Sequence, residues 1–431
     1  MAKVGIVSLG CAKNTIDSES LLGYIAEAGH ALVEEHLAEV LLVNTCTFIE
    51  DAQKESIRAI LEARVGDRRV IVTGCLAQRH REELLDSMPE IDAVIGTGDL
   101  DRIAGVIDRV LGGERLCLVG DGAYREPSVK RVLASIGPST YLRIAEGCDN
   151  PCTFCLIPQI RGPYQSRGMD EIVEEAKALA QGGIKELNLI AQDTTRYGSD
   201  RGRLELPQLL ARLQEVDGLE WIRLLYAYPN TLTDSLLGAM KDLPKVLPYL
   251  DIPLQHSHPE VLKAMKRPHG EPADELVARL RSMIPGLVIR STFIVGFPGE
   301  TEEQFEHLLQ FLQKSRLDHV GAFAYSPMDG TPAAAMKQWP KKLRNERRNE
   351  IMKVQQEISL SIHQQLVGTT LPMLVEGIDE KGRLVGRTHR EAPEIDGTAY
   401  ASAQAGVEPG DVVSLRVARV APYDLFGEVV E

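Results

Sequence analysis

The stretch Cys148-Asp149-Asn150-Pro151-Cys152-Thr153-Phe154-Cys155 comes directly after an apolar, strand-like run. That run is the first of six that alternate with segments of helical period: Tyr141–Ala145, Glu186–Ile190, Trp221–Tyr226, Tyr249–Ile252, Val288–Val295 and His319–Tyr325. Alternating strands and helices predict parallel βα units, and six units predict a partial (βα)6 barrel, because a closed one needs eight. We therefore expect the cysteines at the carboxyl-end face of a barrel over residues 140–340.

The spacing of these three cysteines favours an iron–sulfur cluster. Thiolates of Cys148, Cys152 and Cys155 on one short loop can bind three irons of a cubane cluster. The fourth iron then keeps an open coordination position, which a reactive cluster requires. The alternative is a structural zinc site that lacks its fourth ligand, which His256 or His258 would have to supply from a distance.

Residues 1–111 show a second alternation of strands and helices. The apolar runs are Val4–Leu9, Val40–Val43, Val70–Val72 and Ala93–Ile95, and one helical face carries Leu100, Ile103, Ile107, Val110 and Leu111. Buried parallel strands are typically short and rich in β-branched residues, as these are. The pattern predicts an open, doubly wound α/β domain.

Three further cysteines each follow a strand of this first domain. Cys11, Cys46 and Cys75 stand just past the runs that end at Leu9, Val43 and Val72. The carboxyl ends of parallel strands meet at one edge of the sheet, where doubly wound folds bind ligands. Helix N-termini at that edge favour thiolates and an anionic cluster. We expect a second three-cysteine cluster there, whereas Cys117 fits neither set.

The rest of the chain divides into three segments. Residues 112–139 are rich in Gly, Pro and charge and read as a linker, or as a strap across the next domain. A charged helix is expected over 341–365. Residues 366–431 predict a small antiparallel β-barrel, with strands at Leu371–Val375, Gly382–Arg387, Gly397–Ala401 and Asp411–Val420.

Composition limits the class of protein. The 431 residues suggest about three domains, and 44% hydrophobic residues with 26% charged ones are ordinary for a globular chain. No apolar run reaches the roughly 18 residues that span a bilayer, and the first residues do not read as a signal peptide. Seven cysteines then point to a reducing compartment, and we expect a cytoplasmic protein without membrane partners.

The loop Cys148–Cys155 after a first barrel strand resembles that of the radical S-adenosylmethionine (SAM) enzymes. With three earlier cysteines in an α/β domain and a terminal β-barrel, the chain resembles the methylthiotransferases: a cluster domain, a radical SAM barrel and a TRAM domain. The branch that modifies a ribosomal protein, the RimO type, is indicated by Ser8–Asn14, Ile144–Cys148, Ile190–Thr195, Leu224–Pro229 and Tyr423–Gly427. Ala12 and Thr47 depart from the expected Pro and Gly beside the cysteines.

The resemblance implies a reaction and its cofactors. The Cys148/Cys152/Cys155 cluster would be catalytic, binding SAM at its free iron and cleaving it reductively to give the radical that removes a hydrogen from the target. The Cys11/Cys46/Cys75 cluster would deliver a methylated sulfur. Two [4Fe–4S] clusters, two SAM molecules, a sulfur donor and an electron donor such as a flavodoxin or ferredoxin are implied. The target would be an aspartate of small-subunit ribosomal protein S12, in or near the ribosome, and the product 3-methylthioaspartate.

Several residues at strand ends are candidates for contacts with SAM. The candidates are Phe154, Gln192, Asp193, Arg223, Gln255, Gly296 and Gly299. Glycines allow a backbone to approach a ligand closely, and polar groups at strand tips can hold the methionine portion. The alternatives are a core aromatic at 154, a tight turn at 296–299, and ordinary strand-end polarity for the others.

Charge favours a basic substrate over RNA. The chain carries 48 basic and 62 acidic residues, a formal charge of −14. From Leu366 to Glu431, six basic residues stand against eleven acidic ones, a net charge of −5, which would repel tRNA and attract a basic protein. The alternatives are a tRNA adenosine methylthiotransferase and, in another class, a two-cluster electron carrier, which would normally hold each cluster with four cysteines.

Overall fold

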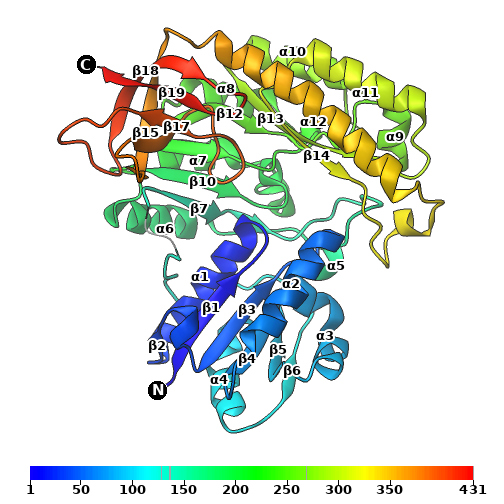
Figure 1. Cartoon of the computed structure of the whole chain (residues 1–431), viewed down its shortest axis with the longest axis vertical. Coiled ribbons are helices and arrows are strands. Elements are labelled where there is room, and N and C mark those ends of the chain that lie inside the picture. The colour runs from blue at the N-terminus through cyan, green and yellow to red at the C-terminus, as the bar shows by residue number, and fades with distance from the viewer. Residues whose placement is uncertain (128, 135–136, 268, 431) are drawn as a thin grey trace. The chain divides into compact units, whose positions relative to one another are not determined.

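The computed structural model describes residues 1–127, 129–134, 137–267 and 269–430. They divide into two compact units, whose chain path Figure 1 shows by colour. Unit one comprises Met1–Ile136, Ala145–Asn150 and Cys155–Arg167; unit two comprises Gly137–Ile144, Pro151–Phe154 and Gly168–Glu431. Among the described helices, none is both long enough and apolar enough to cross a membrane.

Unit one is built on a six-stranded parallel sheet in the order β2-β1-β3-β4-β5-β6. Its strands are β1 Lys3–Ser8, β2 Ala31–Leu32, β3 Val40–Thr45, β4 Arg69–Gly74, β5 Ala93–Ile95 and β6 Leu116–Leu118. Its principal helices are α1 Ala12–Glu27, α2 Glu50–Ala63, α3 Cys75–Ser87 and α4 Ile103–Leu111. The predicted open, doubly wound sheet is confirmed.

Both faces of this sheet are buried, which explains its continuous apolar strands. Val40 and Leu42 of β3 belong to one core with side chains of α1 and α4. Leu41 and Val43, which point the other way, belong to a second core with side chains of α2 and α3. Because successive strand residues face opposite sides, a strand covered on both sides must be apolar throughout.

The linker prediction is wrong at its start. Strand β6 falls inside residues 112–139 and pairs with β5 in parallel, so the first sheet extends into that segment. Three residues are too few to show a strand period, and the flanking charge hides them. A strap was expected across the next domain, but the contact of this segment given by Val132 is with the first domain: its N–H donates to the Glu19 carbonyl of α1 (3.0 Å). Ser128, Ser135 and Ile136 of this segment lie outside the described residues.

Unit two contains the predicted partial barrel, a six-stranded parallel sheet in the order β14-β13-β12-β11-β10-β7. Its strands are β7 Ser139–Arg143, β10 Glu186–Ile190, β11 Trp221–Leu224, β12 Val246–Asp251, β13 Val288–Val295 and β14 His319–Ala324. The accompanying helices are α6 Met169–Gln181, α7 Leu206–Gln214, α8 Asp234–Asp242, α9 Pro259–Ala264, α10 Ala273–Met283 and α11 Glu302–Ser315. Helix α7 contacts α6 and α8, and α10 contacts α8 and α11, so these five helices pack side by side.

A long helix and a closed barrel complete unit two. Helix α12 spans Lys341–Gln364, as predicted, and packs along α11 and β14 (Figure 1). The barrel order is β15-β16-β17-β19-β18, with strands Thr370–Ile378, Leu384–Thr388, Ala399–Ala401, Leu425–Val430 and Val412–Val420, respectively. The predicted small barrel is confirmed, although β19 was not predicted; Glu431 lies outside the described residues.

Candidate functional site

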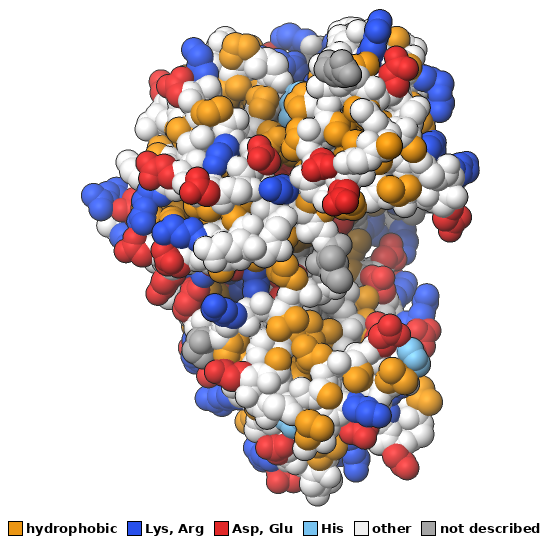
Figure 2. Space-filling model, turned by 90° about the vertical axis from the view of Figure 1, so that its left-hand side faces the viewer, with side chains coloured by type: hydrophobic (Ala, Val, Ile, Leu, Met, Phe, Trp, Pro, Cys, Tyr) orange, Lys and Arg blue, Asp and Glu red, His pale blue; other side chains and the backbone are white. Residues whose placement is uncertain are grey.

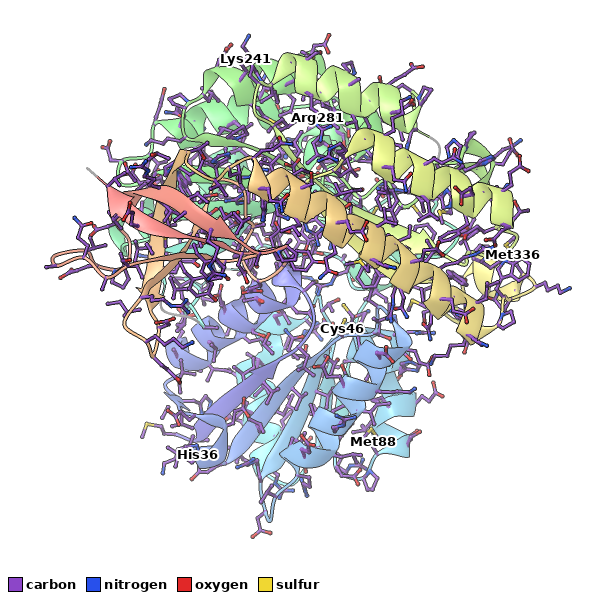
Figure 3. The ribbon with its side chains drawn as sticks, turned by 45° about the horizontal axis from the view of Figure 1, so that its top comes forward. His36, Cys46, Met88, Lys241, Arg281 and Met336 are labelled. Carbon is purple, nitrogen blue, oxygen red and sulfur yellow. The ribbon has the colours of Figure 1, made fainter. Side chains whose placement is uncertain are left out.

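The three cysteines of the first domain gather at one end of the unit-one sheet. Their strands, β1, β3 and β4, are neighbours in the sheet. Cys11 precedes α1, Cys46 follows β3, and Cys75 begins α3. The register pairs Thr45 with Gly74, so the next residues, Cys46 and Cys75, leave their strands at the same level. Figure 3 shows Cys46 at the end of the sheet opposite His36. The predicted convergence of strand ends is confirmed.

Glycine makes the close approach of these loops possible. Gly10 has φ +98°, and a Cβ there would lie 2.9 Å from Cβ of Cys46 and 3.2 Å from its sulfur. A side chain at this position would be strained by the backbone and would collide with the cysteine. The loop that carries Cys11 therefore lies directly against Cys46.

Asn14 ties the three cysteine loops together. Its Nδ2 donates to the carbonyl of Leu9 (2.8 Å) and to that of Thr45 (3.0 Å), which precede Cys11 and Cys46. Its Oδ1 lies 3.8 Å from the sulfur of Cys75. One buried amide thus contacts all three loops.

The electrostatics at this sheet edge suit bound thiolates. Burial raises the pKa of Cys46, and it raises the pKa of Cys75 to about 11 even though the positive charge of Arg161 acts in the opposite direction. Binding of a metal deprotonates such thiols, and a nearby guanidinium and the N-termini of α1 and α3 favour the charged form.

Three thiols at one sheet edge are a donor set that an iron–sulfur cluster can use, since each cysteine of a cubane cluster binds a different iron. Across the described residues, no group of three His, Cys, Asp or Glu side chains is arranged to hold a single metal ion.

The second set of cysteines occupies the loop predicted to hold the radical SAM cluster. In unit one, the backbone N–H groups of Asn150 and Ile157 donate to the sulfurs of Cys148 and Cys155, each at 3.4 Å. In unit two, Nη1 of Arg267 donates to the sulfur of Cys152 (3.7 Å). Donors aimed at sulfur stabilise the thiolate, the form that binds iron.

Three of the predicted SAM contacts lie just past the ends of β10 and β12. Gln192 and Asp193 follow β10, and Asp193 accepts a hydrogen bond from Oγ1 of Thr195 (2.9 Å). Gln255 follows β12 with φ +68°, and its backbone N–H donates to the carbonyl of Thr292 (2.8 Å). Its buried Oε1 accepts no hydrogen bond from the described residues, which suits a contact with a ligand.

The turn after β13 contains two of the predicted SAM contacts, Gly296 and Gly299, and their surroundings differ. Gly296 has φ +68°, and a Cβ there would lie 2.4 Å from Cγ of Arg344, so packing against α12 explains this glycine. Gly299 has φ +87° and open space beside it.

Phe154 is half-buried and packs edge-to-face on Phe297, with ring centroids 6.5 Å apart, in a small apolar cluster.

The side chain of Arg223 lies apart from the other predicted SAM contacts. Its side chain is fully buried, Nε donates to Oε1 of Glu186 (2.9 Å), and Nη1 donates to the carbonyl of His389 (2.8 Å). Glu186 begins β10, so the guanidinium is directed to the amino-end side of the sheet, away from the strand tips. Its partners explain the residue without a cofactor.

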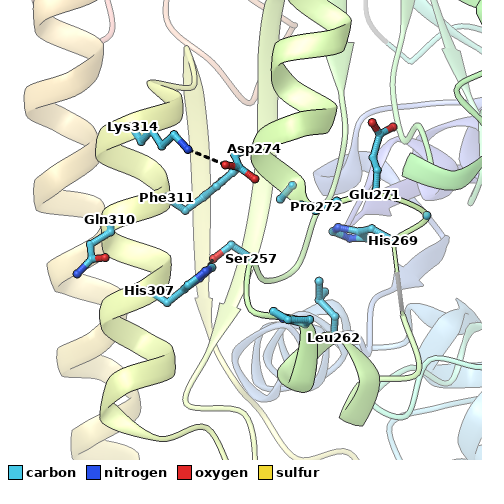
Figure 4. A pocket seen from close by; sticks show the side chains of 13 residues that line it. Ser257, Leu262, His269, Glu271, Pro272, Asp274, His307, Gln310, Phe311 and Lys314 are labelled. Carbon is cyan, nitrogen blue, oxygen red and sulfur yellow. Dashed lines mark hydrogen bonds and ion pairs between the residues drawn. The ribbon is translucent and has the colours of Figure 1, made fainter.

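A cavity of about 580 Å³ lies on another part of unit two (Figure 4). Ser257 and His307 face it with Oγ and Nδ1 3.0 Å apart, and an ion pair joins Lys314 to Asp274 (2.7 Å). No predicted cluster cysteine or SAM contact lines it. Nearby, His256 is completely buried, and burial lowers its pKa to about 3; its Nδ1 accepts a hydrogen bond from the backbone of His258.

Three residues that contact the cysteines were not predicted as site residues. Asn14, Arg161 and Arg267 each contact a cysteine sulfur through a side chain that is buried in the structure. Asn14 stands three residues after Cys11, and that proximity was the only local signal for it. Nothing in the local pattern marks Arg161 or Arg267, because their roles depend on tertiary packing.

Three family models match separate parts of the chain. Residues 3–96 match the uncharacterized protein family UPF0004, residues 142–312 the radical SAM superfamily, and residues 367–430 the TRAM domain.

Relatives of known name match over the whole length. The protein named ribosomal protein uS12 methylthiotransferase RimO from Thermoanaerobacter sp. (strain X514) is 47% identical over 99% of this chain and 100% of its own. The protein of the same name from Pelobacter propionicus is 46% identical over 100% and 98%, respectively. Among solved structures, the radical SAM methyltransferase TsrM from Kitasatospora setae is similar with a TM-score of 0.55 and 16% identity, covering 86% of this chain and 80% of that one. This last likeness shows the fold alone.

Proposed function

The chain belongs to the RimO family of ribosomal protein uS12 methylthiotransferases, and we propose that it attaches a methylthio group to an aspartate side chain of uS12, giving 3-methylthioaspartate. It is a radical SAM enzyme, as identity of about 45% with RimO proteins over the whole chain and the superfamily match require. The observation that carries the proposal is the gathering of Cys11, Cys46 and Cys75 at one sheet edge, in addition to the Cys148–Cys155 loop.

We propose that each set of three cysteines holds one [4Fe–4S] cluster. The cluster on Cys148, Cys152 and Cys155, when bound, supplies the electron that cleaves SAM. The backbone N–H groups of Asn150 and Ile157 and the guanidinium of Arg267 stabilise its ligands as thiolates. The three sulfurs at the unit-one sheet edge hold the second cluster, which accounts for cysteines that a one-cluster enzyme does not need.

The SAM contacts are proposed to come from the strand ends of unit two. Gln192 and Gln255 supply amide groups to the methionine portion, and Asp193 supplies a carboxylate. Gly299 leaves open space in which a ligand can approach the backbone. Phe154, which packs on Phe297, is proposed to contact the adenine. Gly296 contributes by shaping the turn. Contacts of this kind orient a ligand for reaction.

The terminal barrel supports a basic protein as substrate. Two of its six basic residues, Arg387 and Arg390, are buried in ion pairs. Of the described residues from 366 onward, the exposed acids are Glu380, Glu394, Glu408, Asp411 and Glu428, against the exposed bases Lys381, Arg416 and Arg419. Across the face drawn in Figure 2, basic and acidic side chains are interspersed. The excess of exposed acids over exposed bases in the barrel disfavours tRNA and suits a basic ribosomal protein.

The remaining parts of the proposal concern the cellular setting. The reaction takes place in the cytoplasm, where uS12 is made and assembled, in or near the ribosome. A small electron carrier such as a flavodoxin or ferredoxin supplies the electron. Neither the modification of uS12 nor the supply of the electron requires a membrane or binding to free nucleic acid.

Iron content tests the two-cluster arrangement. Anaerobically reconstituted protein should hold about eight irons, and Cys11→Ala should lose about half of them. Cys117→Ala is the matched control, because Cys117 lies in β6 among apolar residues and should leave the iron content unchanged. About four irons in the wild-type protein would contradict the second cluster.

A further inference from the structure

Arg161 is a buried cation that contacts the sulfur of Cys75, one of the proposed cluster ligands. It ends α5 (Ile157–Arg161), six residues after Cys155, and its side chain is only 4% exposed. Its partners Asp17, Glu146, Asn14 and Cys75 all belong to unit one. A fully charged group in such a place is costly unless it is well paired, so its partners show what it does.

The two ends of the guanidinium have different partners. Nη1 pairs with the carboxylates of Asp17 (2.7 Å) and Glu146 (3.6 Å). Nη2 donates to Oδ1 of Asn14 (2.7 Å) and to the sulfur of Cys75 (3.6 Å). The carboxylates hold the guanidinium in place, and the second edge is directed at the cysteines.

Through Asn14 this contact extends to the whole cysteine set. The Asn14 amide holds the loops before Cys11 and Cys46 by its Nδ2 group, while its Oδ1 accepts from Arg161. Asp17 alone could neutralise the charge of an arginine with a purely structural role. Charge pairing therefore does not explain why Nη2 of Arg161 contacts Asn14 and the sulfur of Cys75.

We infer that Arg161 is a positioning residue for the Cys11/Cys46/Cys75 site, which donates to the Cys75 sulfur and supplies the positive charge that stabilises an anionic cluster there. The inference rests on the proposed second cluster. Hydrogen bonds to sulfur and local charge both set the reduction potential of an iron–sulfur cluster. Because Arg161 follows Cys155 in the chain, the same segment that carries the radical SAM motif also tunes the first site.

The test uses a full-length background in which Cys148, Cys152 and Cys155 are all replaced by Ala, so that only the first site can bind iron. Arg161→Gln removes the charge, and Arg161→Lys keeps the charge but loses the fork that reaches both Asn14 and Cys75. Arg64→Gln is the matched control, since Arg64 pairs with Asp92 and does not contact a cysteine. The readouts are iron content and the midpoint potential followed by electron paramagnetic resonance.

The background protein should hold about four irons. Arg161→Gln should shift the midpoint potential of that cluster to a more negative value, Arg161→Lys should shift it less in the same direction, and Arg64→Gln should not shift it. If Arg161→Gln does not fold, the shift in midpoint potential of the Arg161→Lys variant tests the inference in its place. Potentials equal to the background in the Arg161 variants would overturn the inference. A background protein without iron would overturn the second cluster itself, and this role with it.

Discussion

Glu186 of β10 and Arg387 of β16 form an ion pair of 2.5 Å, with both side chains almost completely buried, although 201 residues separate them in the chain. Arg223 pairs with the other carboxylate oxygen at 2.9 Å. Burial alone would raise the pKa of Glu186, but Arg387 and Arg223 overcome this and hold it at about 2. The terminal barrel is therefore attached to the central sheet through buried charge.

A second set of contacts strengthens this attachment. Asp396 accepts a hydrogen bond from the hydroxyl of Tyr249 (2.6 Å) and lies 3.3 Å from Nε of Arg290. Arg390 pairs with Asp318 at 2.6 Å. Separated from the central sheet, the terminal barrel would expose these charged groups, so its binding properties should be measured on the full chain.

Acidification should weaken this attachment. The pKa of Glu186 is lowered from 4.5 in the unfolded chain to about 2 in the folded one, so its contribution to stability is complete above about pH 4.5 and is lost as the pH falls towards 2. The contribution is on the order of 3 kcal/mol. Glu186→Gln should lower the free energy of unfolding at pH 7 and flatten its dependence on pH in that window, as urea titrations would measure. Equal slopes in wild type and variant would contradict this assignment.

The two cysteine sets should separate by function. Cys152→Ala should abolish formation of 5′-deoxyadenosine from SAM under reducing, anaerobic conditions, because it removes a ligand of the cluster that cleaves SAM. Cys46→Ala should retain most of that cleavage yet form no methylthiolated product. Chromatography of the nucleoside and mass spectrometry of the product measure the two steps. Equal loss of cleavage in both variants would refute the division of roles.

Sequence reasoning was accurate where one local pattern decides the structure. The strand from Val288 to Val295 was predicted to the residue, since β-branched and apolar residues stand at both of its ends. The cysteines converge because parallel topology alone brings strand ends together. The partners of Arg223 could not be predicted, because Glu186 and His389 are remote from it in the chain. Strand β6 was missed because its three residues stand in a segment rich in Gly, Pro and charge.

Gln255 provides the sharpest test of the proposed SAM contacts. Gln255→Leu keeps a side chain of similar volume but removes the unsatisfied Oε1, and it should weaken SAM binding by about tenfold, since hydrogen bonds to charged groups contribute about 1.5–3 kcal/mol. Calorimetry on the reconstituted protein measures the Kd. Gln310→Leu, on an exposed face of α11, is the matched control. Arg223→Lys should likewise leave the Kd unchanged; a tenfold loss there would restore Arg223 to the site.

Charge should govern substrate binding. The full-length chain should bind the basic ribosomal protein in a manner that weakens as salt is raised, because the attraction acts between exposed charges. Replacement of Glu408 and Asp411 by neutral residues should weaken binding further, since both are exposed acids of the terminal barrel. Fluorescence anisotropy at several salt concentrations measures this. Tight, salt-sensitive binding to tRNA with none to the ribosomal protein would favour the tRNA-modifying alternative.

Mass spectrometry of ribosomal proteins and tRNA from a strain that lacks this chain, compared with the parent strain, tests the central claim most directly. The account predicts that uS12 from the parent carries one methylthio group in place of a hydrogen on an aspartate, that this modification disappears in the deletion strain, and that methylthiolated tRNA nucleosides are unchanged. Loss of a methylthio group from tRNA, with uS12 identical in the two strains, would contradict it.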